Sequence, residues 1–333
     1  LLITEGFRDL LRIGYQTRPR LFDLDIRRPD LLYETVAEVP ERLDADGAAI
    51  RPLDESALRA ALTAAYAQGI RAVAIAFLHA WLNPVHEARA AAIAAELGFT
   101  QISASHQVSR LIKLVGRGDT TVVDAYLSPI LRRYVDQVAG ALDLGRGCER
   151  LMFMQSNGGL TEATRFQGKD AILSGPAGGI VGMVRTASAA GHDLLIGFDM
   201  GGTSTDVSHY AGTFERSFET EVAGVRMRAP MMDIHTVAAG GGSILSFRDG
   251  RYQVGPESAG ARKISLSVLT AKIVADRIPT FLATRSLRRR IQTISILIFA
   301  FGFVPTVFIE LRKKCVTRNC LMHFGQKQFV RVG

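Results

Sequence analysis

Residues 194–208 constrain the fold more than any other part of the chain, because two apolar runs flank a short polar turn. The first run ends at an acidic residue, two glycines and three hydroxyl residues follow, and a second acidic residue precedes Val207. This order predicts a strand, a tight turn and a returning strand. An ordinary hairpin is the simplest interpretation, since Gly-Gly is a common turn sequence.

The polar residues of this turn also suit an anion. Glycine accepts positive φ and lets the backbone come close to a ligand, so we expect the amides of Gly201 and Gly202 to face phosphate oxygens. Further donors are the hydroxyls of Thr203, Ser204 and Thr205. Asp199 and Asp206 flank the turn and would repel phosphate unless a cation lay between them. Because hard oxygen ligands beside phosphate favour Mg²⁺, the sequence predicts a magnesium and phosphate site here.

This turn resembles the phosphate-binding hairpin shared by sugar kinases, actin and heat-shock chaperone ATPases. More narrowly, several separated motifs resemble the hydantoinase A and oxoprolinase family and occur in the family's order. They are residues 4–9, 39–43, 161–162, 174–179, 198–208 and 233–244. The resemblance covers residues 1–261 and ends there.

The resemblance implies an α/β fold, namely a partial actin-like or sugar-kinase-like ATPase fold with the second half of the first domain and the start of the second. It divides the chain into the C-terminal part of the family's N-terminal region (1–108), the N-terminal part of the hydantoinase A/oxoprolinase domain (109–261) and an unrelated tail (262–333). Actin-like ATPases clamp ATP between two phosphate hairpins. Only one is present here, so the first is expected upstream of residue 1, and the isolated chain, as an incomplete family member, is expected to be inactive.

The resemblance also implies an activity, the ATP-dependent hydrolysis of a cyclic amide such as a hydantoin or 5-oxoproline. It assigns Asp199 to Mg²⁺ or the attacking water, residues 201–205 to the phosphates and Asp206 to Mg²⁺ through water. The nucleotide would contact Gly240, Gly241 and Gly242. A hydantoinase B-type subunit or domain is the expected partner. The alternatives are a subunit of an ATP-dependent carboxylase and a non-catalytic nucleotide-binding subunit.

Composition changes after residue 261. The last 72 residues carry a net charge of +12 and the preceding ones −4, so the basic character of the chain belongs to its tail. Glycine also becomes rare there, and we expect a foreign or out-of-frame extension. A membrane segment at 294–309, which is almost wholly apolar, is the rival interpretation, but its sixteen residues are short of the ~20 that span a bilayer. Charged and aromatic residues are segregated, which argues against a nucleic-acid surface.

Strand and helix patterns alternate along the rest of the chain, which favours an α/β fold. We expect helices at 5–15, 55–68, 84–97 and 125–142, with an interruption near Pro129, and a Gly-Pro loop at 174–179 that leads into another helix. His235 is interpreted as a core residue of a strand. Three cysteines make no disulfide framework, so a reducing cytoplasm is the expected compartment. No Gly-x-Ser-x-Gly sequence occurs, which argues against unaided serine hydrolysis.

Overall fold

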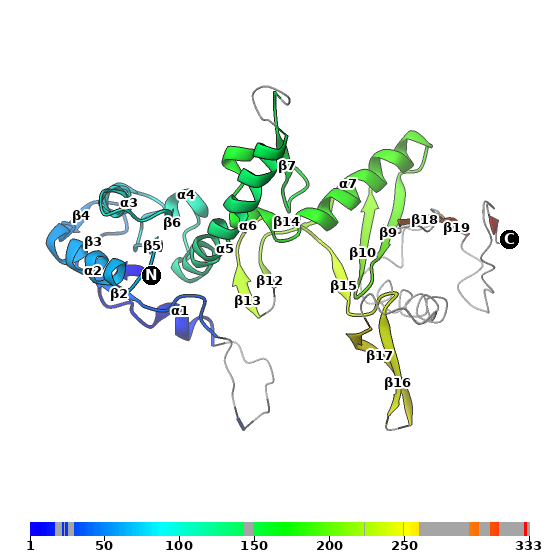
Figure 1. Ribbon diagram of the computed structural model, residues 1–333, viewed down its shortest axis with the longest axis horizontal. Coiled ribbons are helices and arrows are strands. Elements are labelled where there is room, and N and C mark those ends of the chain that lie inside the picture. Colours follow the sequence, from blue (N-terminus) through cyan, green and yellow to red (C-terminus); the bar gives the residue numbers. More distant parts are fainter. Residues whose placement is uncertain are drawn as a thin grey trace. The chain divides into compact units, whose positions relative to one another are not determined.

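The computed structural model divides the chain into two compact units, whose elements are labelled in Figure 1. Unit 1 comprises Leu1–Ser174 and Ser217–Met231, and unit 2 comprises Gly175–Arg216 and Met232–Gly333. The residues that the structure describes are 1–16, 22, 24–25, 30–142, 149–222, 224–248, 250–259, 293–299, 307–312 and 330–331. The two units are defined by their compactness in space, whereas the three expected segments were defined by family resemblance and composition, so the two divisions describe different properties.

Unit 1 is built on a parallel four-stranded sheet with the order β2-β1-β5-β6. Its strands are β1 (Leu2–Thr4), β2 (Ala37–Val39), β5 (Ala72–Ala76) and β6 (Gln101–Ala104). The central strand β5 is an uninterrupted apolar run and is almost wholly buried. Such a run is typical of a parallel strand that is covered on both faces.

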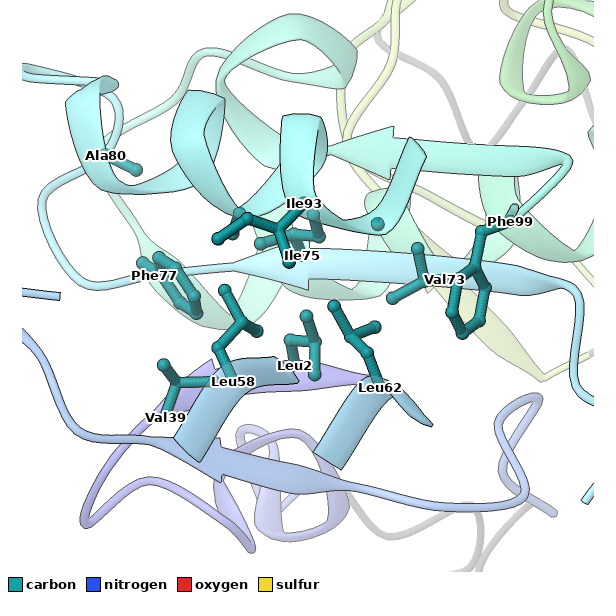
Figure 2. Packing of buried hydrophobic residues seen from close by; sticks show 12 residues of the cluster. Leu2, Val39, Leu58, Leu62, Val73, Ile75, Phe77, Ala80, Ile93 and Phe99 are labelled. Carbon is teal, nitrogen blue, oxygen red and sulfur yellow. The ribbon is translucent and has the colours of Figure 1, made fainter. Parts of the chain in front are cut away.

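Two helices, α2 (Glu55–Ala67) and α3 (Val85–Glu96), cover one face of this sheet. Figure 2 shows their leucine and isoleucine side chains against alternate residues of β5, with Leu2 and Val39 from the neighbouring strands. The opposite face, which carries Ala74, packs against α1 (Leu10–Ile13) and α5 (Leu114–Ala141). The result is a three-layer α/β/α arrangement, as the alternating pattern predicted.

The expected helix at 5–15 is wrong except for its last turn, α1. Gly6 adopts φ +90° and its amide donates to Glu38 Oε1 (2.8 Å), so the chain turns after β1 instead of continuing into a helix. The long helix α5 begins at Leu114, eleven residues before its expected start, and passes through Pro129 without a break. Its early glycines hid it: a Cβ on Gly118 would lie 2.8 Å from Leu11 Cδ2, so glycine is needed there for packing.

The helices at 55–68 and 84–97 are confirmed within two residues as α2 and α3. Asp54 caps α2, because its Oδ1 accepts from the Ala57 amide (2.9 Å). Unit 1 also contains three short helical elements: α4 (Ser105–Val108), α6 (Gly168–Ala171) and the 3₁₀ helix Ala163–Arg165. Three two-stranded pairs complete it: β3 (Arg42–Leu43) with β4 (Ala49–Arg51), β7 (Met152–Met154) with β8 (Leu160–Glu162), and β12 (Thr220–Val222) with β13 (Val225–Met227). Strands β11 (Arg216–Ser217) and β14 (Met231–Met232) form a further two-stranded pair.

Unit 2 contains a mixed six-stranded sheet with the order β15-β10-β9-β18-β19-β20. The strands are β9 (Leu194–Met200), β10 (Thr205–Ala211), β15 (His235–Val237), β18 (Thr293–Phe299), β19 (Val307–Arg312) and β20 (Val330–Arg331). The helix α7 (Ser174–Ala189) precedes β9, and β16 (Ser243–Arg248) pairs with β17 (Arg251–Ser258). Most of the expected tail at 262–333 lies outside the described residues, apart from β18, β19 and β20. Among the described residues, no helix is long and apolar enough to cross a membrane.

A buried charge network joins α3, α4 and α5 in unit 1. Glu87 has no exposed surface, and its carboxylate accepts from the Phe77 amide (2.8 Å), the Ser105 hydroxyl (2.6 Å) and the His106 amide (2.9 Å). Arg117, also without exposed surface, donates through Nε to the same Ser105 hydroxyl (2.8 Å). Because each charge is fully hydrogen-bonded, burial is tolerated here.

Replacing Glu87 by alanine should lower the free energy of unfolding by about 3–5 kcal/mol, because it leaves the Arg117 charge buried without its counterpart. Chemical denaturation of the purified chain measures this loss. Glu96→Ala on the same helix is the control: its ion pair with Arg59 is half exposed, and its loss should cost less than about 1 kcal/mol. Equal effects of the two changes would contradict the assignment.

Asp119 of α5 provides a second test, one of pH dependence. Burial raises the pKa of its carboxyl to about 6, even though Arg226 NH2 lies 3.1 Å away and acts in the opposite direction. An acid whose pKa is raised on folding stabilises the fold below its unfolded pKa of 3.8 and loses that contribution as pH rises to about 6. The stability of the wild type relative to Asp119→Asn should therefore fall by up to about 3 kcal/mol between pH 4 and pH 6. Denaturation curves across this range that stay parallel would refute it.

Candidate functional site

The predicted strand, turn and strand at 194–208 is confirmed as the antiparallel hairpin of β9 and β10 (Figure 1). Its register sets Thr205 opposite Met200 and Asp206 opposite Asp199. Residues directly opposite each other on paired strands project from the same face, with their Cβ atoms about 4.5–5.5 Å apart. The register therefore brings the two acidic residues together beside the turn.

This acidic pair carries an electrostatic cost. Burial and then the nearby Asp206 charge raise the pKa of Asp199 above its usual value. No hydrogen-bond donor from the described residues reaches the Asp199 carboxylate, in contrast to the fully satisfied Glu87. A cation placed between the two carboxylates would remove the repulsion.

The turn presents unused donors next to this pair. The amides of Gly202, Thr203 and Ser204 find no acceptor among the described residues, and the turn is exposed from Gly201 to Thr203. We expected Gly201 and Gly202 to adopt a left-handed backbone conformation with positive φ. That expectation is wrong, because neither residue has positive φ. A bond from the Gly201 amide to the Ser204 carbonyl (2.9 Å) shapes the turn instead.

The glycine segment 240–242 packs directly against this turn. The amides of Gly241 and Gly242 donate to the carbonyls of Gly201 (2.9 Å) and Gly202 (2.7 Å). A Cβ on Gly240 would lie 2.6 Å from the Gly201 carbonyl oxygen and 2.7 Å from Thr203 N, so only glycine fits there. The segment therefore supports the turn, and all three of its amides are already bound within the protein, since the Gly240 amide donates to Ser243 Oγ (2.8 Å).

Thr205 also helps to hold the turn in position. Its side chain is buried, and its hydroxyl donates to the carbonyl of Ala239 (2.6 Å). The hydroxyls of Thr203 and Ser204, in contrast, have no hydrogen-bond partner among the described residues. Of the three predicted hydroxyl donors, these two are therefore available to a ligand in the observed arrangement.

The segment 174–179 is the start of α7 and not the loop that we expected, because helical structure begins at Ser174. The helix packs on the face of β9 that carries the acidic pair: a Cβ on Gly197 would lie 2.7 Å from Met183 Sδ. Near its beginning, Gly179 approaches the hairpin, and its missing Cβ would lie 3.7 Å from Asp199 Oδ2. A longer side chain at Gly179 would enter the space beside that carboxylate.

Thr236 is a site residue that the sequence analysis did not single out. It lies opposite Asp206 in the pairing of β10 with β15, and its hydroxyl donates to Asp206 Oδ1 (2.7 Å). Only the strand pairing reveals this contact, since 30 residues separate the two in sequence. His235, the neighbouring residue that we expected in the core, is exposed.

The donor set suits magnesium bound together with phosphate better than a metal held by protein alone. The described residues contain no group of three or more His, Cys, Asp or Glu side chains that could hold a metal ion. Mg²⁺ usually keeps several waters and binds through one or two carboxylates together with phosphate oxygens. Asp199 and Asp206 could supply the carboxylates, and the amides of the turn without an acceptor among the described residues would suit phosphate.

Known protein families and relatives match most of this chain. The family model described as Hydantoinase/oxoprolinase N-terminal region matches residues 1–98, and the one described as Hydantoinase/oxoprolinase matches residues 117–277. The 5-oxoprolinase of Saccharomyces cerevisiae is 43% identical over 289 residues, which covers 78% of this chain and 22% of the yeast protein. The chain thus spans about a fifth of the length of that relative.

Solved structures give the fold. The nucleotide-free structure of acetone carboxylase has a TM-score of 0.65 at 25% identity, and the ATP-dependent caprolactamase of Pseudomonas jessenii has 0.63 at 35%. Each match covers 78% of this chain and 39% of the solved chain. These likenesses confirm the prediction of a partial actin-like α/β fold. The motifs, the two family models and the structural neighbours agree, and the chain belongs to the hydantoinase/oxoprolinase family.

Proposed function

We propose that this chain forms the magnesium-nucleotide site of an enzyme that uses ATP to open a cyclic amide of the 5-oxoproline or hydantoin class. The observation that carries the proposal is the facing pair of Asp199 and Asp206 beside a turn in which three amides find no acceptor among the described residues. A half-buried pair of like charges lowers stability, so its presence at a ligand-accessible turn favours a functional role.

Within this proposal the side chains have distinct roles. Asp199 and Asp206 would hold Mg²⁺, Asp206 through water, and Asp199 is also placed to orient the attacking water. The amides of residues 202–204 and the hydroxyls of Thr203 and Ser204 would bind the phosphates. Thr205 and the glycines 240–242 would fix the turn in position, a supporting role in place of the nucleotide contact that the resemblance implied.

The chemistry explains why a cyclic amide would need ATP. A lactam carbonyl is a poor electrophile because the amide nitrogen donates into it. ATP, when bound, supplies a γ-phosphoryl group whose transfer to the carbonyl oxygen makes that oxygen a leaving group. The chain itself would contribute positioning and charge neutralisation, which carry most of the catalysis in phosphoryl transfer.

The substrate class and partner follow from the relatives. The 5-oxoprolinases are more similar to this chain than acetone carboxylase is, 43% against 25% identity, which favours cyclic amide hydrolysis over carboxylation. The caprolactamase of P. jessenii matches through its subunit alpha, which supports a hydantoinase B-type partner subunit or domain. A cytoplasmic location fits an ATP-dependent enzyme.

Three functions can be separated by two measurements. Calorimetric titration of the 333-residue chain with ATPγS, with and without Mg²⁺, tests nucleotide binding. Phosphate release is then followed in a chimera in which this chain replaces its matching segment in yeast 5-oxoprolinase. Turnover stimulated by 5-oxoproline or hydantoin supports the proposal, stimulation by acetone and bicarbonate supports a carboxylase, and binding without turnover supports a non-catalytic subunit.

Replacing Asp199 by asparagine should weaken magnesium-dependent ATPγS binding by about tenfold or more, which corresponds to about 1.4 kcal/mol. The fold should persist, because the change also removes one of two facing like charges. Asp193→Asn is a matched control, since this exposed acid precedes β9 and does not face the turn. Unchanged binding by the Asp199 variant would reject its assignment to magnesium.

Replacing Gly240 by alanine should displace the turn, because the new Cβ would lie within 2.7 Å of backbone atoms that cannot rotate away. We expect ATPγS binding to fall by about tenfold and the thermal midpoint to drop, at a cost of about 1–3 kcal/mol for overpacking. Gly241→Ala is the control, since its Cβ would make an ordinary 3.7 Å contact with the Gly201 carbonyl oxygen. If the two variants behaved alike, the close approach at Gly240 would not matter.

A further inference from the structure

We infer that Thr236 is a positioning residue that holds Asp206 for the magnesium ion, an inference that rests on the proposed function. Its hydroxyl donates to Asp206 Oδ1 at 2.7 Å, so one carboxylate oxygen is taken by the protein. The other oxygen remains for the cation or its water. A hydrogen bond of this kind fixes the side-chain rotamer of a ligand before the metal arrives.

The strand register explains why such a restraint is needed. Asp199, Asp206 and Thr236 form one row across β9, β10 and β15, with Asp206 in the middle. Like charges that face each other repel, so an unrestrained Asp206 would favour rotamers that take its carboxylate away from Asp199. Such rotamers would separate the two carboxylates that the ion has to bridge.

A second observation concerns the surroundings of Thr236. Thr236 is exposed, as is His235 beside it, so the residue is not retained for burial in the core. Valine would fill the same volume in an exposed strand and has a high strand propensity. The hydroxyl is therefore the part of the side chain that matters for Asp206.

The test uses the full 333-residue chain and three variants. Thr236→Val removes the hydroxyl at constant shape, Thr236→Ser keeps it, and Thr213→Val is a control at an exposed threonine of unit 2 outside the row. Calorimetry measures ATPγS affinity with Mg²⁺ and with EDTA, and the electron paramagnetic resonance of Mn²⁺ measures metal affinity directly. Thermal unfolding reports on the fold.

Loss of an outer-sphere partner of a metal ligand typically costs about 10–100-fold in metal affinity. Thr236→Val should therefore weaken Mn²⁺ binding and magnesium-dependent ATPγS binding by at least about tenfold, with the EDTA affinity and thermal midpoint unchanged. Thr236→Ser should stay within about twofold of the wild type, and Thr213→Val should match it.

Two results would overturn the inference, and they can be told apart. If the wild type binds the magnesium nucleotide and Thr236→Val binds it equally well, Thr236 does not position Asp206 and the proposed function stands. If Thr236→Val lowers only the thermal midpoint, the contact is structural. If the wild type shows no magnesium-dependent binding, the proposed function fails and this inference fails with it.

Discussion

The site depends on the register of one hairpin. Backbone pairing between β9 and β10 sets Asp206 directly opposite Asp199, so the two side chains leave the sheet side by side and only their rotamers can move the carboxylates apart. A slip by one residue would move one of the two carboxylates to the other face of the sheet. The strand register therefore decides whether the hairpin can serve a cation at all, and the contacts around it have to hold that register.

Those contacts come from segments far apart in sequence. The glycine segment 240–242 binds the carbonyls of the turn, Thr205 binds Ala239, and α7 packs through Met183 against Gly197. Each contact relies on a residue that is small or has a short polar side chain. Rigid support of this kind is what a binding turn needs, because an ordered donor array loses less entropy when the ligand arrives.

The sequence revealed the parts with a strong local pattern. The hairpin of β9 and β10 and the helices α2 and α3 follow from apolar runs, turn residues and helical patterns. Glycine was the main source of error, because it was interpreted as a mark of loops or of left-handed turns. In α5, Gly116 and Gly118 instead allow neighbouring side chains to pack close to the helix, and Gly240 allows close packing between backbones. Such needs depend on neighbours that the sequence does not place. Thr236 shows the same limit for polar residues, since its partner is defined by strand pairing and not by spacing along the chain.

Two carboxylates of the protein, Glu87 and Asp199, differ in how the fold satisfies them. Glu87 is fully buried, yet the protein supplies donors to both of its oxygens, as a structural charge requires. Asp199 lies half-buried beside a second carboxylate, and its pKa is raised by burial and by Asp206. Under the proposed function, Asp199 would be left for a cation, and the amides of residues 202–204, which find no acceptor among the described residues, would suit a phosphate group.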